Sequence, residues 1–228
     1  MSVNYDALPR WHKINTNQVL INENGDRLIN VSDMNSRIIC VPHYYINGVP
    51  GATENCYMRE SVYGLLLVAL ELLPKGFGFK VFDAWRPYEV QKFLFEEYVA
   101  KLQLSENISL KEAEEKARRF VSYPSSDKSK PFVHSTGGAV DLTIIDDNDR
   151  ELNMGTSFDD FSLLAFTDYY ESTLNNEIKN NRRLLYNVMT KVGFSNYPSE
   201  WWHYDYGDAF WASEKNENCA FFGGILKL

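Results

Sequence analysis

The chain has 228 residues, of which 44% are hydrophobic, 14% aromatic and 24% charged, so one globular domain over residues 1–228 with a sizeable core is expected. The formal net charge of −8, without a sustained stripe of Lys or Arg, argues against nucleic acids and anionic membranes as partners. Residues 65–73 form an apolar run that is only about half as long as a membrane span of roughly 20 residues.

The N-terminal residues and the cysteines indicate a location. Residues 1–17 have no positively charged region followed by an apolar run, so they do not look like a secretory signal. Cys40, Cys56 and Cys219 are odd in number and lack the spacing of a metal site, which favours reduced thiols over a disulfide framework. We therefore expect a cytoplasmic protein.

The first third of the chain predicts short strands around one core helix. Asn24 and Gly25 separate two apolar runs within residues 18–31, which is a hairpin pattern. Residues 55–73 carry apolar side chains at helical spacing and stop before a Pro-Lys-Gly turn, so we expect a packed helix there. Residues 77–84 alternate as a strand does.

Arg86 follows that strand and precedes Pro87. The residue before a proline is restricted to extended conformations, so this arginine is expected at a fixed place where its guanidinium can face an oxyanion or a carboxylate. A surface salt bridge is the alternative interpretation. We expect Asp83, near the end of the same strand, to orient its neighbours rather than to react.

Two amphipathic helices are predicted next, over residues 88–104 and 109–121, and Ser109 forms a capping box with Glu112 at the start of the second. Residues 122–131 are polar and contain prolines, which predicts a loop. Such a loop can cover a site and limit the size of a substrate, although an inert linker would have the same composition.

The C-terminal third predicts one further helix, over residues 175–191, because apolar side chains recur there with helical period and Gly193 follows. Two basic runs, residues 116–119 and 182–183, lie on predicted helices, and we expect them to be solvated faces. Residues 207–228 are rich in turn residues and predict no chemistry.

The clearest chemical signal is a histidine and an aspartate, His134 and Asp141, with Gly137 and Gly138 between them. Their odd separation places the two side chains on opposite faces of an unbroken strand, so they can share a site only if the glycines turn the chain. Residues 139–145 then read as a buried strand rich in β-branched residues. We expect His134 on the approach to this strand and Asp141 within it.

A second pair, Glu200 and His203, lies about sixty residues later among aromatic residues. An offset of three places both side chains on one side of a turn but on opposite sides of a strand, and the preceding Pro-Ser pair favours a turn, with a strand from about Trp201. Trp202 and Tyr204 are then expected to pack in the core while His203 faces the metal.

Together these residues supply the parts of a catalytic zinc site. Zinc in such sites takes three protein ligands and keeps a fourth position for water, whose pKa falls to roughly 7. His134, Asp141 and His203 make that set, and Glu200 is left as a general base that takes the proton of the water and passes it to the leaving amine. A single histidine is more often structural, but two such motifs in one chain favour the metal site.

Four motifs in this order resemble the zinc D-alanyl-D-alanine dipeptidases (VanX-like), which are related to the zinc D,D-carboxypeptidases. The matching residues are Asp83, Arg86 and Pro87, then His134, Gly137, Ala139 and Asp141, then the segment from Met154 to Asp159, and finally Glu200, Trp202 and His203. The resemblance runs from about residue 37 to about residue 212.

The resemblance implies roles for residues outside the zinc set. Asp159 would pair with the free ammonium group of a dipeptide, so a longer peptide would bury an uncharged amide against this carboxylate, at a cost of about 1 to 3 kcal/mol. The family also has a tyrosine that helps to hold the amino end of the substrate, for which Cys40, Tyr44 and Tyr45 mark the corresponding region here. Phe132 stands where the family commonly has a serine, so an aromatic ring replaces a hydroxyl that can bond polar substrate atoms.

The sequence thus predicts an α+β fold in which a small, mainly antiparallel sheet carries one zinc ion per chain and helices flank the sheet. The expected activity is hydrolysis of a short D,D-peptide, and the resemblance implies D-alanyl-D-alanine as the substrate. Glu200 would activate water, Arg86 would stabilise the oxyanion and contact the substrate, and Asp159 would anchor its amino end.

Two alternatives stay open. A D,D- or L,D-carboxypeptidase acting on cell-wall peptides would use the same zinc-site residues but needs an open cleft and normally export. A catalytically silent module that binds zinc or peptides is the other alternative. Glu200 argues against it, because such a module has no need of a general base.

Overall fold

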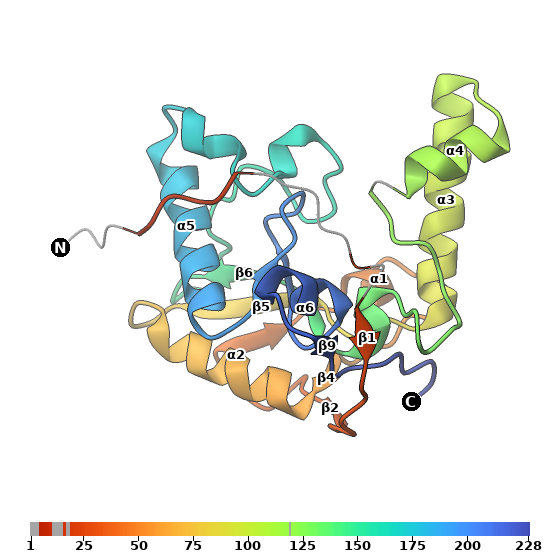
Figure 1. Cartoon of the computed structure of the whole chain (residues 1–228). Helices are drawn as coiled ribbons and strands as arrows, with labels where there is room; N and C mark the ends of the chain where they lie inside the picture. The colour runs from red at the N-terminus through yellow and green to blue at the C-terminus, as the bar shows by residue number, and fades with distance from the viewer. Residues whose placement is uncertain (1–4, 11–15, 17–18, 119) are drawn as a thin grey trace.

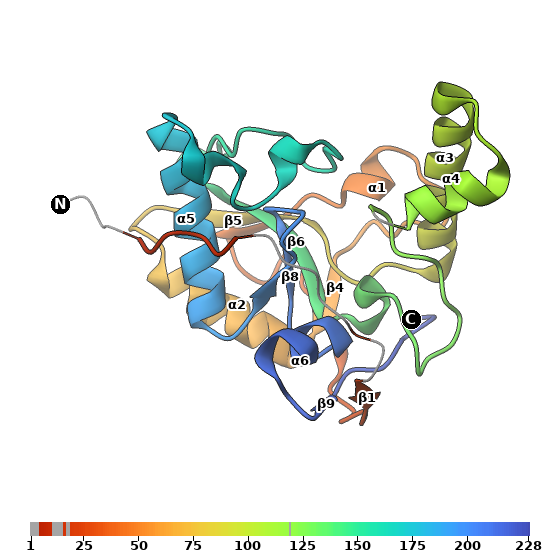
Figure 2. The same cartoon turned by 45° about the horizontal axis from the view of Figure 1, so that its top comes forward.

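The computed structural model describes residues 5–10, 16, 19–118 and 120–228, and a five-stranded sheet lies at its centre (Figures 1 and 2). The strands of this sheet are β3 (Ile38–Cys40), β5 (Gly78–Asp83), β6 (Ala139–Ile145), β7 (Ser195–Asn196) and β8 (His203–Asp205). Their spatial order is β3, β5, β6, β8 and β7, and every pair is antiparallel except β3 with β5. The predicted α+β fold with a mainly antiparallel sheet is confirmed, with one parallel pair at its edge.

Two helices, α2 (Glu60–Leu72) and α5 (Asn176–Lys191), pack against the sheet and form the main core. In Figure 1 they lie side by side on the side away from α3. The core residues that these elements share are Val62, Leu66 and Leu70 of α2, Leu184, Leu185, Val188 and Met189 of α5, and Val140, Leu142 and Ile144 of β6. Trp202 and Tyr204 are each 1% exposed in the same core, so the expected inward face of β8 is confirmed.

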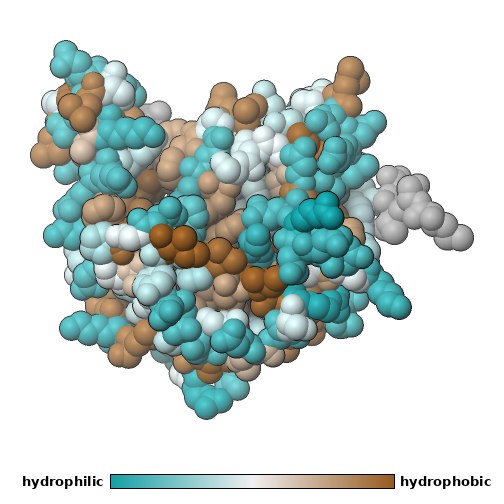
Figure 3. Space-filling view, turned by 180° about the vertical axis from the view of Figure 1, so that it is seen from behind, coloured by the Kyte–Doolittle hydropathy of each residue, from teal (hydrophilic) through white to brown (hydrophobic). Residues whose placement is uncertain are grey.

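Two further helices, α3 (Tyr88–Glu106) and α4 (Leu110–Ala117), stand beside the sheet as a prominence (Figures 1 and 3). The predicted capping box is present, since the Ser109 hydroxyl accepts from the Glu112 amide and the Glu112 carboxylate accepts from the Ser109 amide. This pair has a separate small core, against which Phe161 of a distant segment packs. The prominence is therefore joined to the segment that carries Asp159.

The short elements connect these layers. They are α1 (His43–Ile46), η1 (Val133–Thr136), η2 (Leu163–Ala165), η3 (Tyr169–Ser172) and α6 (Ala209–Lys215). Helix α6 lies within residues 207–228, which were predicted to be rich in turns. Among the described residues, none of the helices combines the length and the apolar character that crossing a membrane requires.

The predicted hairpin around Asn24 and Gly25 is wrong. Strand β1 (Leu20–Ile21) pairs in parallel with β9 (Cys219–Ala220), and β2 (Leu28–Asn30) pairs antiparallel with β4 (Tyr57–Arg59). The loop between β1 and β2 is held by Glu23, whose carboxylate accepts from Arg59 at 3.0 Å and from the Gly223 amide. Tertiary partners therefore override the local turn preference. Residue 18 of the predicted hairpin lies outside the described residues.

Two predicted boundaries move in the structure. The helix expected from residue 55 begins at Glu60, because residues 57–59 pair with β2 as strand β4. The strand expected from about Trp201 begins at His203, because the turn continues through Trp202.

The expectation that residues 182–183 form a solvated face is wrong for Arg182, which is 1% exposed. Its guanidinium donates to the carbonyls of Met154, Phe166 and Leu164 at 2.6 to 2.8 Å. Arg183 pairs with Glu171. In the other basic run, Lys116 pairs with Glu106, Arg118 lies over the Tyr123 ring, and residue 119 is outside the described residues.

Candidate active site

Three neighbouring strands and one 3-10 helix bring the predicted residues together. Asp141 of β6 lies directly opposite His203 of β8 on one side and Asp83 of β5 on the other. His134 lies in η1, and Gly137 then turns the chain with a φ of 72°, in the left-handed region. The turn that the two glycines predicted is confirmed, and it allows His134 and Asp141 to face the same point.

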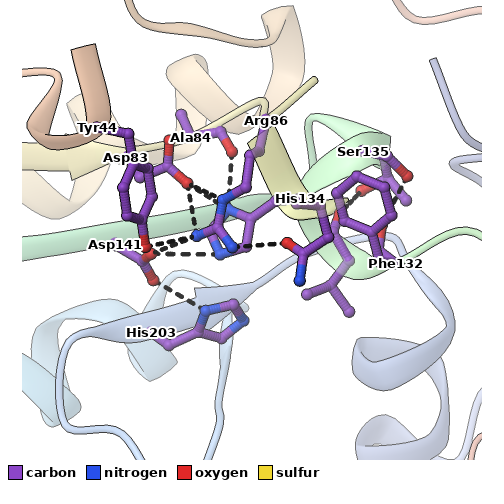
Figure 4. A network of polar contacts seen from close by, with 12 residues as sticks. Tyr44, Asp83, Ala84, Arg86, Phe132, His134, Ser135, Asp141 and His203 are labelled. Atoms are coloured by element: carbon purple, nitrogen blue, oxygen red, sulfur yellow. Dashed lines mark hydrogen bonds and ion pairs between the residues drawn. The ribbon is translucent and has the colours of Figure 1, made fainter. Parts of the chain in front are cut away.

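The side chains of His134, Asp141 and His203 converge in the interior of the protein (Figure 4). His134 Nε2 lies 3.3 Å from Asp141 Oδ2, and His203 Nδ1 lies 2.9 Å from Asp141 Oδ1. One ligand atom from each residue lies within 4.8 Å of the others, and the three residues are 2 to 4% exposed. The arrangement offers two nitrogens and one carboxylate to a cation.

Hydrogen bonds behind the imidazoles determine which ring nitrogens face this point. His134 Nδ1 donates to the Ala84 carbonyl at 2.7 Å, and His203 Nε2 donates to Asp205 Oδ1 at 3.0 Å. A neutral imidazole has one donor and one acceptor nitrogen, so His134 Nε2 offers a lone pair, and His203 Nδ1 offers one when a metal ion replaces the proton that it shares with Asp141 Oδ1. Metal-binding histidines characteristically have such a partner on the second nitrogen, and the donor set therefore fits zinc.

The electrostatic surroundings also favour a cation. Burial opposes a charge on His203, but Asp205 and Asp141 together outweigh it and raise the pKa of His203 well above its ordinary value. Anionic groups that favour a proton on this imidazole also favour a metal ion in its place.

Arg86 is buried beside these residues and makes no surface salt bridge, so that alternative is wrong. Its guanidinium donates to Asp83 Oδ2 at 2.7 Å and to Gln91 Oε1 at 2.7 Å, and it lies 3.5 Å from Asp141 Oδ2. A third hydrogen bond, 3.3 Å long, is donated to the Tyr44 hydroxyl. Burial disfavours the guanidinium charge, but Tyr44 and the nearby carboxylates outweigh this and raise the pKa of Arg86, so it stays charged.

The polar end of the site is formed by Tyr44 and Asp159. The Tyr44 hydroxyl donates to Asp159 Oδ2 at 2.8 Å. Of the other residues in the corresponding region, Tyr45 is 45% exposed, and Cys40 lies 3.9 Å from the Val31 carbonyl, so Tyr44 is the one at the site. Burial raises the pKa of Asp159 to about 6, with Arg86 opposing and Asp141 adding to the shift.

Glu200 lies at the edge of the proposed ligand set. Its Oε2 is 3.9 Å from His203 Nδ1, and its side chain is 18% exposed. Burial raises the pKa of Glu200 to about 8, while His203 opposes and Asp141 adds to the shift. A carboxyl group with this pKa can hold and release a proton near neutral pH.

A cleft of about 1650 Å³ opens onto this centre. Its walls include the predicted site residues, the inner side of α3 and part of the loop of residues 122–131. The loop that was expected to cover the site or to be an inert linker therefore lines the cleft.

Three residues near the centre were not predicted. Gln91, in the first turn of α3, joins Arg86 to the Ser122 carbonyl, to which its amide donates at 2.7 Å. Asp205 supports His203, and Asp208 lies behind it at the start of α6, with one buried oxygen on each carboxyl group lacking a hydrogen-bond partner. Only Asp205 had a readable signal, because it lies two residues after His203 and so on the same face of the strand.

The η1 helix is held from behind by a C-terminal segment. The Ile225 amide donates to the Ser135 carbonyl at 2.8 Å, and its carbonyl accepts from the Trp85 indole at 2.8 Å. Arg59 is 3% exposed and donates to the Thr136 and Gly223 carbonyls. The position of His134 therefore depends on residues 223–225.

Comparison with known proteins gives one consistent result. The peptidase family described as D-Ala-D-Ala dipeptidase matches residues 52–220. A D-alanyl-D-alanine dipeptidase of Synechocystis sp. is 33% identical over 60% of this chain, and the match spans 62% of that relative, less than two thirds of its length. A D-alanyl-D-alanine dipeptidase of Enterococcus faecium is 33% identical over 72% of this chain and 76% of that relative.

One solved structure is similar at a lower level. It is the vancomycin resistance D,D-pentapeptidase VanY in complex with Zn(II), with a TM-score of 0.48, 15% sequence identity, and coverage of 90% of this chain and 97% of that chain.

Proposed function

Because the chain belongs to the D-Ala-D-Ala dipeptidase family of peptidases, we propose that it hydrolyses the peptide bond of a short D,D-peptide, with D-alanyl-D-alanine as the reference substrate. The observation that carries this proposal is the convergence of His134, Asp141 and His203, with Glu200 alongside. The catalytically silent alternative gains no support, because a carboxyl group stands where a general base is needed.

His134 Nε2, Asp141 and His203 Nδ1 would hold one zinc ion. When bound, zinc supplies Lewis acidity that lowers the pKa of water to about 7, polarises a carbonyl group, and adds positive charge that favours the ionised Glu200. The remaining chemistry belongs to side chains of this protein.

Glu200 and Arg86 divide the remaining work. The Glu200 carboxylate accepts a proton from the attacking water and delivers it to the nitrogen of the leaving amino acid as the C–N bond breaks. The Arg86 guanidinium is fixed by Asp83 and Gln91, so it faces the developing oxyanion without first having to reorganise.

Asp159 would bind the free ammonium group of the substrate, with Tyr44 holding the carboxylate in place. A peptide with further residues on its amino side would place an uncharged amide there. This arrangement favours a dipeptidase over a carboxypeptidase that acts on longer cell-wall peptides. We also propose a cytoplasmic location, which the three free cysteines support.

The test is the Glu200→Gln variant of the zinc-loaded protein. We expect kcat for D-alanyl-D-alanine to fall by about 10²- to 10⁴-fold, the usual contribution of a general acid–base group, while the zinc content is unchanged. The matched control is Glu97→Gln, which removes a carboxylate from the outer part of the same cleft and should retain activity. Full activity of Glu200→Gln would exclude the mechanism, and faster cleavage of a longer D,D-peptide would favour the carboxypeptidase.

A further inference from the structure

The cleft has two ends that lie on opposite sides of the proposed zinc ligands. In Figure 2, α1 and the segment of residues 154–166 lie on one side of β6 and β8, and η1 and α6 lie on the other. Tyr44 and Asp159 belong to the first side, and Phe132 and Phe210 belong to the second. Figure 4 likewise places Phe132 on the opposite side of His134 from Tyr44.

The second end is aromatic. Phe132 and Phe210 are 4% and 6% exposed, which is close to the exposure of the proposed ligands, and both line the cleft. The Tyr197 ring lies between this end and the centre, with its centroid 5.4 Å from that of Phe210 and 5.9 Å from that of His203. Such a wall favours an apolar side chain over the polar groups of a peptide end.

The cleft is also larger than the reference substrate requires. Its volume is about 1650 Å³, whereas pockets for whole drug-sized ligands measure roughly 300 to 1,000 Å³. D-Alanyl-D-alanine has only a methyl group to offer to the aromatic end.

We propose that this aromatic end, formed by Phe132, Tyr197 and Phe210, is a subsite for the side chain of the leaving residue. The preferred substrates are D,D-dipeptides with a large apolar C-terminal residue, such as D-Ala-D-Leu or D-Ala-D-Phe. This inference rests on the proposed function, because the ammonium group at Asp159 sets the direction of the peptide.

The test begins with kcat/KM of the zinc-loaded protein for D-Ala-D-Ala, D-Ala-D-Leu, D-Ala-D-Phe and the reversed D-Phe-D-Ala. One extra methylene group that fits an apolar pocket changes kcat/KM by about 10- to 200-fold. We expect D-Ala-D-Leu and D-Ala-D-Phe to be cleaved at least about 10-fold better than D-Ala-D-Ala, and D-Phe-D-Ala to show no such gain. Equal or better cleavage of D-Ala-D-Ala would overturn the inference.

Variants then locate the preference. Phe132→Ser should lower the ratio of D-Ala-D-Phe to D-Ala-D-Ala cleavage by about 10-fold, while Phe132→Leu, which keeps an apolar side chain, should largely preserve it. The matched control is Tyr123→Ser, because Tyr123 is 51% exposed and lines the outer part of the cleft. An unchanged ratio in a folded Phe132→Ser protein would overturn the assignment of Phe132.

Binding of the product amino acids separates this inference from the proposed function. If no dipeptide is cleaved, the proposed function fails, but calorimetry with free D-Phe and D-Ala still tests the subsite. Tighter binding of D-Phe that weakens in Phe132→Ser supports the subsite, and equal binding of both amino acids overturns it.

Discussion

Asp159 combines a proposed role in substrate binding with features that lower stability. It adopts a φ of 59°, in the left-handed region that few side chains other than glycine favour, and its carboxylate faces Tyr44 and Arg86 in the cleft. Burial raises its pKa to about 6. A residue held in an unfavourable state of charge and backbone indicates a functional constraint.

We expect Asp159→Asn to lower kcat/KM for D-alanyl-D-alanine by about 10- to 100-fold, because a charged partner of the ammonium group is lost. The asparagine carbonyl still accepts from Tyr44, so the site should keep its shape. N-acetyl-D-Ala-D-Ala is the discriminating substrate, because its uncharged amide should be cleaved by the variant at least as well as by the wild type. An equal loss on both substrates would count against the ammonium-binding role.

The same carboxyl group predicts a pH dependence of stability. Because the folded pKa of about 6 lies above the ordinary value of 3.8, the folded state holds the proton more tightly, and stability falls as the pH rises from about 4 to about 6. After metal has been removed with a chelator, the free energy of unfolding of Asp159→Asn should equal that of the wild type at pH 4. At pH 7 it should exceed the wild-type value by about 1 to 2 kcal/mol, since partial exposure of the carboxyl group reduces the effect. Urea unfolding at both pH values measures this difference.

At the scale of single residues, the sequence predicted the site residues whose own chemistry, such as metal binding or proton transfer, points to a function. His134 and His203 were predicted because each is spaced from a carboxylate in a way that lets the pair share a metal ion. Gln91 and Asp208 act through neighbours that only the folded chain brings to them. The sequence shows Phe132 as a departure from the family pattern. The aromatic character of its surroundings could not be predicted, because it depends on Phe210, nearly eighty residues away.

At the scale of elements, the segment of residues 154–166 depends on a single side chain of α5. Arg182 donates to three carbonyls of this segment, which also carries Asp159. Burial lowers the pKa of Arg182 to about 10, which still leaves it charged at neutral pH. The segment that carries Asp159 is therefore attached to the main core through α5.

We expect Arg182→Met to lower the free energy of unfolding by about 3 kcal/mol or more, because three carbonyls lose their donor and each buried unsatisfied group costs about 1 to 3 kcal/mol. The KM for D-alanyl-D-alanine should rise as Asp159 loses its support, while the zinc content stays the same. Arg183→Met is the matched control. Arg183 forms an ion pair with Glu171 and holds none of the three carbonyls, so its loss should leave KM unchanged and lower the free energy of unfolding by less than the loss of Arg182. Similar effects of the two variants on KM would refute the special role of Arg182.

Elements were predicted best where one local rule was sufficient. Strand β6 and the capping box of α4 follow from β-branched periodicity and from a four-residue pattern, and both appear where they were expected. The pairing of β1 and β2 did not follow, because their partners lie far away along the chain. Arg182 was taken for a surface charge because a helical pattern alone does not show that backbone carbonyls cover one position.

At the scale of the whole molecule, the proposed zinc ligands join η1 and β6 to β8, which follows about sixty residues later in the sequence. An ion that binds only the folded state stabilises it by about 4 kcal/mol at a free concentration 1,000 times its Kd. We therefore expect chelation to lower Tm by about 10 °C in a protein of this size and zinc to restore it. His203→Ala should abolish the response to zinc, and a Tm that is independent of zinc in the wild type would contradict the proposed ligand set.

The hold of residues 223–225 on η1 has a consequence for biosynthesis. Residues 223–225 follow every proposed ligand in the chain, yet the Ile225 amide donates to the Ser135 carbonyl, next to His134, and the Gly223 carbonyl accepts from Arg59. A nascent chain can therefore complete its sheet while the metal-binding position is still loosely held. The metal-binding position is therefore expected to become fully ordered only after this later segment has docked onto η1.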